Sequence, residues 1–61
     1  MPVISIELGP ISTEVKKELI NSLTKSASQA TNIPEQTFVV IVKEYALDAI
    51  GVGGTPLSER K

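Results

Sequence analysis

The order of its apolar segments is the feature that most constrains this sequence, because one helical segment lies between two strand-like segments. Residues 2–8 alternate in character, with Ile4, Ile6 and Leu8 on one side of the expected strand. Residues 37–43 are β-branched and almost continuously apolar. That pattern is typical of a strand covered on both faces, as in a parallel sheet. A helix joining two such strands predicts an α/β fold built from a single βαβ unit.

Residues 13–31 have the periodicity of an amphipathic helix. Ser12 is a favourable N-cap residue, and Pro34 disfavours helix in the residue before it, so the helix is expected to end near residue 31. Lys16, Lys17 and Lys25 are expected on its solvated side. The apolar side recurs at intervals of three and four residues and consists of Val15, Leu19, Ile20, Leu23, Ala27 and Ala30.

The C-terminal part is rich in glycine and predicts a turn structure rather than a further long element. Residues 45–50 are compatible with one helical turn, and residues 51–54 read Gly-Val-Gly-Gly, which predicts a tight turn or a C-terminal β-hairpin. Residues 55–61 are expected to form a tail. With 61 residues in total, we expect a single domain over residues 1–61.

A lone βαβ unit leaves two open sheet edges and one uncovered face, which predicts self-association. Chains shorter than about 70–80 residues usually depend on a disulfide, a metal or a partner for stability. The sequence contains no cysteine and no histidine, so we expect no disulfide, no metal site and no metal cofactor. A homo-oligomer that extends the sheet is the remaining solution.

Composition also excludes several classes of function. The formal net charge of −1 argues against nucleic-acid binding and against a polybasic membrane surface. Ser5 and Glu7 interrupt the apolar start, which is unlike a secretory signal, and no segment approaches the roughly 18 apolar residues of a membrane span. We therefore expect a cytoplasmic protein.

Pro2 is a candidate catalytic base, which matters because no histidine can serve as one. If Met1 is removed, Pro2 carries a free secondary amine. An α-amino group has a reference pKa of about 7.7–8.0, and apolar surroundings lower it further, toward the range useful for general base catalysis. The alternative is that Pro2 only protects the end of a strand.

Four segments together have a recognisable pattern: the start Met-Pro-Val-Ile-Ser-Ile-Glu-Leu, residues 12–20, Val-Ile-Val-Lys-Glu at 40–44 and Gly-Val-Gly-Gly at 51–54. In this order they resemble the 4-oxalocrotonate tautomerase family. The resemblance spans nearly the whole chain. It implies a βαβ unit with a C-terminal hairpin, usually assembled as a hexamer, and an amino-terminal proline that moves a proton within an enol or dienol acid without a cofactor. Pro2 matches that proline.

Three positions depart from the pattern that this resemblance implies. The family's tautomerases usually bind substrate carboxylates with two arginines, and those places fall at Ile11 and Val39. An aromatic pocket residue is replaced by Ile50. Because an aliphatic side chain cannot replace a bidentate arginine, a dicarboxylate such as 2-hydroxymuconate is not the favoured substrate.

Other groups are candidates for the missing anion contact. Lys43 has the strand parity of Val39, and Arg60 lies on the expected tail, from which it could cross a subunit interface. Backbone N–H groups near Leu8 and Gly9 could also bind an anionic oxygen. The candidate substrate-binding residues are therefore Leu8, Ile11, Val39 and Ile50, with Lys43 and Arg60 as possible anion contacts.

The remaining polar residues receive plainer interpretations. Glu7 and Glu44 are expected as exposed strand-end carboxylates, and Tyr45 as a packing residue with a solvated hydroxyl that could alternatively donate a proton to an oxyanion. The resulting hypothesis is a cofactor-independent tautomerase of an enol or 2-oxo acid. Two alternatives stay open: another proline-assisted reaction, such as hydration or decarboxylation, and a non-catalytic assembly or ligand-binding module.

Overall fold

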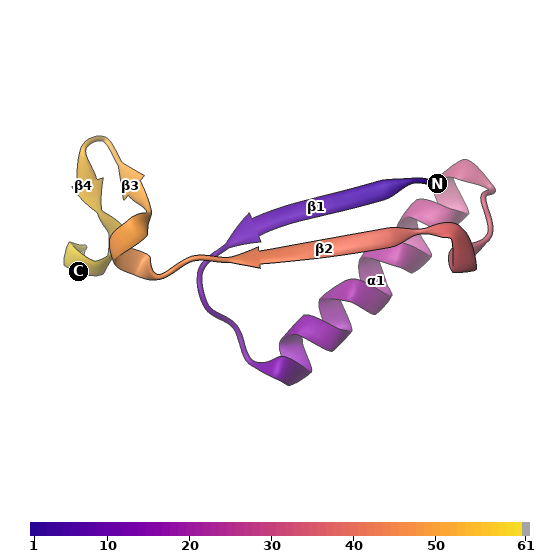
Figure 1. Ribbon diagram of the computed structural model, residues 1–61, viewed down its shortest axis with the longest axis horizontal. Coiled ribbons are helices and arrows are strands. Elements are labelled where there is room, and N and C mark those ends of the chain that lie inside the picture. The colour runs from indigo at the N-terminus through magenta and orange to yellow at the C-terminus, as the bar shows by residue number, and fades with distance from the viewer. Residues whose placement is uncertain (61) are drawn as a thin grey trace.

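The computed structural model describes residues 1–60, which form a βαβ unit followed by a small hairpin (Figure 1). This confirms the predicted fold class. Lys61, the last residue of the expected tail, lies outside the described residues. The long elements are β1 (Val3–Leu8), α1 (Thr13–Thr31) and β2 (Val39–Glu44), and the hairpin consists of β3 (Gly51–Val52) and β4 (Thr55–Pro56). Single 3₁₀ turns are η1 (Glu35–Thr37), η2 (Leu47–Ala49) and η3 (Leu57–Glu59).

The strands β1 and β2 pair in parallel, with Val3 opposite Val39 and Leu8 opposite Glu44. Both strands begin later than predicted, at residues 3 and 39 instead of 2 and 37. The second strand is delayed because η1 takes up residues 35–37: the N–H of Thr37 donates to the carbonyl of Pro34 at 3.1 Å. The parallel pairing requires the crossover that α1 provides.

The helix α1 has the predicted bounds, and both of its ends are capped. The Oγ of Ser12 accepts a hydrogen bond from the N–H of Val15 at 3.1 Å. At the other end Asn32 adopts a left-handed conformation with φ 62°, and its N–H donates to the carbonyl of Ser28 at 2.8 Å. These local contacts set the length of the helix that returns the chain to the start of the sheet.

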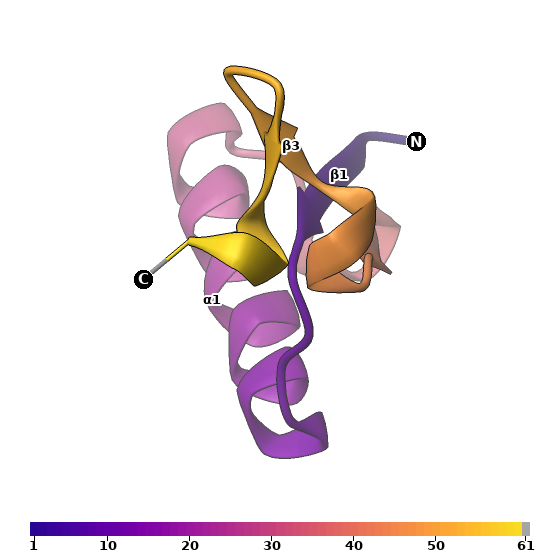
Figure 2. The same cartoon turned by 90° about the vertical axis from the view of Figure 1, so that its left-hand side faces the viewer.

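One face of the sheet is covered by α1 and the other is open (Figures 1 and 2). Ile4 and Ile6 of β1 alternate with exposed residues and are half-buried on the covered face. On the open face Val3 is 52% exposed and Ile41 is 41% exposed. Within residues 1–60 of the isolated chain, no side chain is fully buried. In a single chain the open face therefore leaves apolar side chains uncovered, and the core is not closed on that side.

Residues 51–59 form a hairpin and a 3₁₀ turn that are hydrogen-bonded to the rest of the chain. The expectation of a tail from residue 55 was therefore wrong. Gly53 and Gly54 have φ of 62° and 87°, and two adjacent positive values are what a two-residue hairpin turn of this hand requires. Beyond the turn, Thr55 pairs with Val52, and the N–H of Leu57 donates to the carbonyl of Ile50 at 2.8 Å.

The described part of the chain contains no helix that is long and apolar enough to cross a membrane.

Candidate active site

A groove with a volume of about 610 Å³ lies where the end of β1 meets the base of the hairpin. Most of its lining is apolar, and Glu7 is its one charged side chain. The other lining residues are Leu8, Gly9, Tyr45, Ala49, Ile50, Gly51 and Leu57. Of the candidate substrate-binding residues, Leu8 and Ile50 therefore share this groove.

Backbone contacts between distant segments build the groove. The N–H of Tyr45 donates to the carbonyl of Leu8 at 2.9 Å, which holds the chain after β2 against the end of β1. Gly9 allows η2 to pack closely, because a Cβ at that position would lie only 3.1 Å from the side chain of Leu47. The hairpin base is tied on by the bond between Leu57 and Ile50 described above. The groove is thus fixed by main-chain geometry.

The polar element of the groove is a hydrogen bond between two of its lining side chains. The hydroxyl of Tyr45 donates to Oε1 of Glu7 at 2.9 Å. This bond, followed by desolvation and the charge of Glu7, raises the pKa of Tyr45 above its ordinary value of 10.0. Tyr45 is exposed, as expected for a residue with a solvated hydroxyl, and its hydrogen-bond partner is a carboxylate 38 positions earlier in the sequence.

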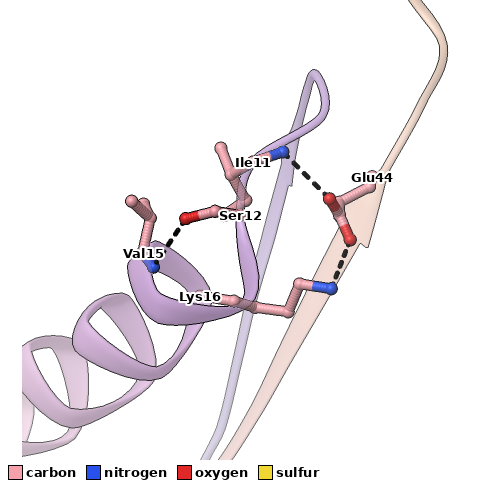
Figure 3. A network of polar contacts seen from close by, with 5 residues as sticks. All are labelled: Ile11, Ser12, Val15, Lys16 and Glu44. Atoms are coloured by element: carbon pink, nitrogen blue, oxygen red, sulfur yellow. Dashed lines mark hydrogen bonds and ion pairs between the residues drawn. The ribbon is translucent and has the colours of Figure 1, made fainter.

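A second polar network fixes the loop before α1 (Figure 3). The backbone N–H of Ile11 donates to Oε2 of Glu44 at 3.0 Å, and Nζ of Lys16 lies 2.6 Å from Oε1 of the same carboxylate. The Ile11 hydrogen bond first, and then the Lys16 contact, hold the pKa of Glu44 below its ordinary 4.5. Lys16, which was expected on the solvated side of the helix, remains 36% exposed and in addition contacts Glu44 at the end of β2.

Pro2 lies at the opposite end of the sheet from the groove. Its carbonyl accepts a hydrogen bond from the N–H of Val39 at 2.9 Å, and both residues are half-buried. Pro2 and Leu8 are six residue steps apart along extended chain, which corresponds to about 20 Å. In Figure 1 the N-terminus and the hairpin accordingly lie at opposite ends of the 42 Å long axis. Pro2 and the groove of one chain therefore do not meet.

The other candidate residues lie near the groove but outside its lining. Ile11 is held in the Glu44 network, and its side chain is half-buried. Lys43 is the cross-strand partner of Glu7. Arg60 follows η3, and its N–H donates to the carbonyl of Leu57 at 3.1 Å. Over residues 1–60, no three acidic side chains gather in an arrangement that could hold a metal ion.

The βαβ unit with its C-terminal hairpin places the chain in the α/β class, and comparison with known sequences gives the family. A sequence model described as "Tautomerase enzyme" matches residues 2–60. The chain belongs to the tautomerase family. This confirms the resemblance found in the sequence.

Individual relatives agree with this assignment along the full length of the chain. A probable tautomerase from Bacillus cereus is 33% identical over 61 residues, which cover 98% of this chain and 100% of the relative. The structure of a heterohexamer 4-oxalocrotonate tautomerase from Chloroflexus aurantiacus J-10-fl aligns with a TM-score of 0.91 at 31% identity, covering both chains completely. A 4-oxalocrotonate tautomerase homologue in the tomaymycin biosynthetic pathway aligns with a TM-score of 0.93 at 30% identity, covering 97% and 92% of the two chains.

Proposed function

We propose that this chain is a cofactor-independent tautomerase that moves a proton within an enol or 2-oxo acid, with Pro2 as general base. In this proposal residues 1–61 are one tautomerase-like domain, and Met1 is removed so that Pro2 carries a free secondary amine. The observation that carries the proposal is the position of Pro2. Its carbonyl accepts a hydrogen bond from the N–H of Val39 at the start of the sheet, which anchors the residue whose nitrogen is the proposed base.

The proposed site combines Pro2 of one copy with the groove of another. Reacting atoms must come within about 3–3.5 Å, whereas Pro2 and Leu8 of one chain are separated by about 20 Å. The open sheet face with Val3 and Ile41, and the two unpaired sheet edges, support association of copies as the means of bringing them together. A homo-oligomer, with the hexamer as its expected form, follows from this requirement and from the hexameric relative.

The proposed reaction moves one proton from oxygen to carbon within the substrate. The Pro2 nitrogen accepts the proton of an enol hydroxyl while the C–O bond becomes a carbonyl and the carbon–carbon double bond shifts. The proline then returns that proton to carbon. Apolar groove residues Leu8 and Ile50 would keep the amine neutral by disfavouring its charged form. Lys43 and Arg60 remain candidates for holding the substrate carboxylate, and Ile11 and Val39 for shaping the site.

Replacement of the proposed base tests this function. Pro2→Ala should lower kcat/KM for ketonisation of phenylenolpyruvate by at least about 100-fold, because it replaces the ring-held secondary amine with a primary amine that is no longer positioned as general base. Pro34→Ala is the matched control, because Pro34 lies outside the groove and should leave the rate within about threefold. Light scattering checks that both variants assemble as the parent does.

The alternatives predict other results. A Pro2→Ala variant with undiminished rate and unchanged assembly would contradict the proposal and favour a ligand-binding or assembly module. Activity that falls as pH rises through the amine pKa would instead indicate that the protonated proline is required, as in a hydratase or decarboxylase.

A further inference from the structure

We propose that Glu7, oriented by Tyr45, is a specificity-determining residue that excludes a second carboxylate from the groove. The substrates would then be enol or 2-oxo acids with one carboxylate and an uncharged tail. This inference rests on the proposed function, because it assigns the substrate class of the same groove. It goes beyond the absence of arginine at Ile11 and Val39, since it identifies a group that acts against dicarboxylates.

The position of Glu7 carries the inference. Its side chain lines the groove, and the Tyr45 hydroxyl holds its Oε1 at 2.9 Å. Glu7 is an exposed residue, and this bond fixes one oxygen of its carboxylate beside Tyr45. Lys43 is the strand partner of Glu7 but lies outside the lining, so Glu7 is the one charged side chain among the residues that line the groove.

The rest of the lining matches an uncharged substrate tail. Leu8, Ala49, Ile50 and Leu57 supply apolar contacts around the same space. A methyl or aryl end would bury apolar surface against them. A carboxylate in that place would instead lose hydration and face the negative charge of Glu7. The groove therefore combines attraction for an apolar tail with repulsion of an anionic one, which is how strong discrimination is usually built.

Binding of two ligands of equal carbon number tests the inference without relying on turnover. The ligands are 2-oxopentanoate, which ends in a methyl group, and 2-oxoglutarate, which ends in a second carboxylate. Calorimetric titration of the assembled protein should give a Kd for 2-oxoglutarate about tenfold higher than the Kd for 2-oxopentanoate. A tenfold ratio is at the low end of what the repulsion between two like charges about 4–5 Å apart at a hydrated surface would produce. Added salt should reduce this ratio, because exposed charges are screened.

Substitutions then assign the ratio to Glu7. Glu7→Gln keeps an acceptor for the Tyr45 hydroxyl but removes the charge, so the ratio should fall to about two or less. Tyr45→Phe keeps the charge but releases it, and its ratio should lie between those of the parent and Glu7→Gln. Glu18→Gln on α1 is the control for the same change of charge outside the groove and should leave the ratio unchanged.

The outcomes separate this inference from the proposed function. A ratio that survives Glu7→Gln, or a parent protein that binds 2-oxoglutarate as tightly as 2-oxopentanoate, would overturn the role of Glu7 even if Pro2 is catalytic. A ratio that responds to Glu7 as described supports that role, because the titration measures binding alone. Loss of activity in Pro2→Ala is measured separately and tests only the base.

Discussion

Complementation between two inactive variants tests whether the active site is shared between copies. The first variant is Pro2→Ala, which replaces the proposed secondary-amine base with a primary amine lacking the proline ring. The second is Ala49→Trp, which fills the groove from an exposed position in its lining. Each variant alone should be nearly inactive. Refolded together from denaturant in equal amounts, they should regain activity, because some sites receive Pro2 from one variant and an open groove from the other.

The expected yield follows from the separation of the two parts. Since Pro2 and the groove of one chain are about 20 Å apart, every working site draws on two chains. With random assembly, half of the Pro2 positions and half of the facing grooves are intact, so about one quarter of the sites carry both. A site contained within one chain would regain none.

The assay is the rate of phenylenolpyruvate ketonisation per chain, before and after the two variants are refolded together. Ala30→Trp at the end of α1 is the matched control: Ala30 lies outside the groove, so this variant should be active by itself. Activity that stays at the level of the separate variants, in mixtures shown by mass spectrometry to contain both chains, would refute the reasoning.

Three further predictions concern the contacts that hold the fold. Because the pKa of Glu44 is held below 4.5, its ionised form stabilises the fold above that value. The stability lost in Glu44→Gln, measured by urea unfolding at fixed protein concentration, should therefore be larger at about pH 7 than at about pH 3. An equal loss at both pH values would contradict this. The only tyrosine is Tyr45, so absorbance of tyrosinate should titrate with a midpoint above 10.0, and Glu7→Gln should move the midpoint toward 10.0; an unmoved midpoint would exclude Glu7 as the cause. Ser12→Ala should lower the free energy of unfolding by about 1 kcal/mol through loss of the N-cap, whereas Ser22→Ala within the same helix should change it by less than about 0.5 kcal/mol, and equal losses would argue against capping.

Local signals in the sequence were sufficient for most of the fold. The helix bounds 13–31 followed from Ser12 as an N-cap and from the break imposed before Pro34, and both features act within a few residues of their position. The glycines at 53 and 54 adopt positive φ, which is why the hairpin was predictable there. The start of the second strand was predicted two residues too early, at residue 37, because η1 occupies residues 35–37.

Contacts between distant segments could not be predicted in the same way. Tyr45 and Glu7 are 38 positions apart, and Ile11 and Glu44 are 33 apart, so no local spacing reveals either contact. The register of the parallel strands is the missing information. Once Leu8 is placed opposite Glu44, the residues that follow each strand come together, and the groove forms between them.

The candidate site was predictable in its parts but not in their arrangement. Alternation of apolar residues placed Leu8 at the end of a strand, and the glycine-rich turn marked the segment that contains Ile50. The sequence carries no signal that places Ile50 beside Leu8 and not beside Pro2, whereas the length of the predicted strand already implies about 20 Å between Leu8 and Pro2. That distance is the reason for assigning the two parts of the site to different copies.

The titration of the proline nitrogens tests the central claim most directly. The sequence contains four prolines, and in a chain labelled with ¹⁵N-proline only an amino-terminal one can gain and lose a proton, since the others are amides. We expect one of the four nitrogen resonances to move with pH, with a midpoint below the reference range of about 7.7–8.0, because the mostly apolar lining disfavours the charged amine more than Glu7 favours it. A spectrum in which no proline nitrogen titrates, or one with a midpoint at or above that range, would contradict Pro2 as a neutral base.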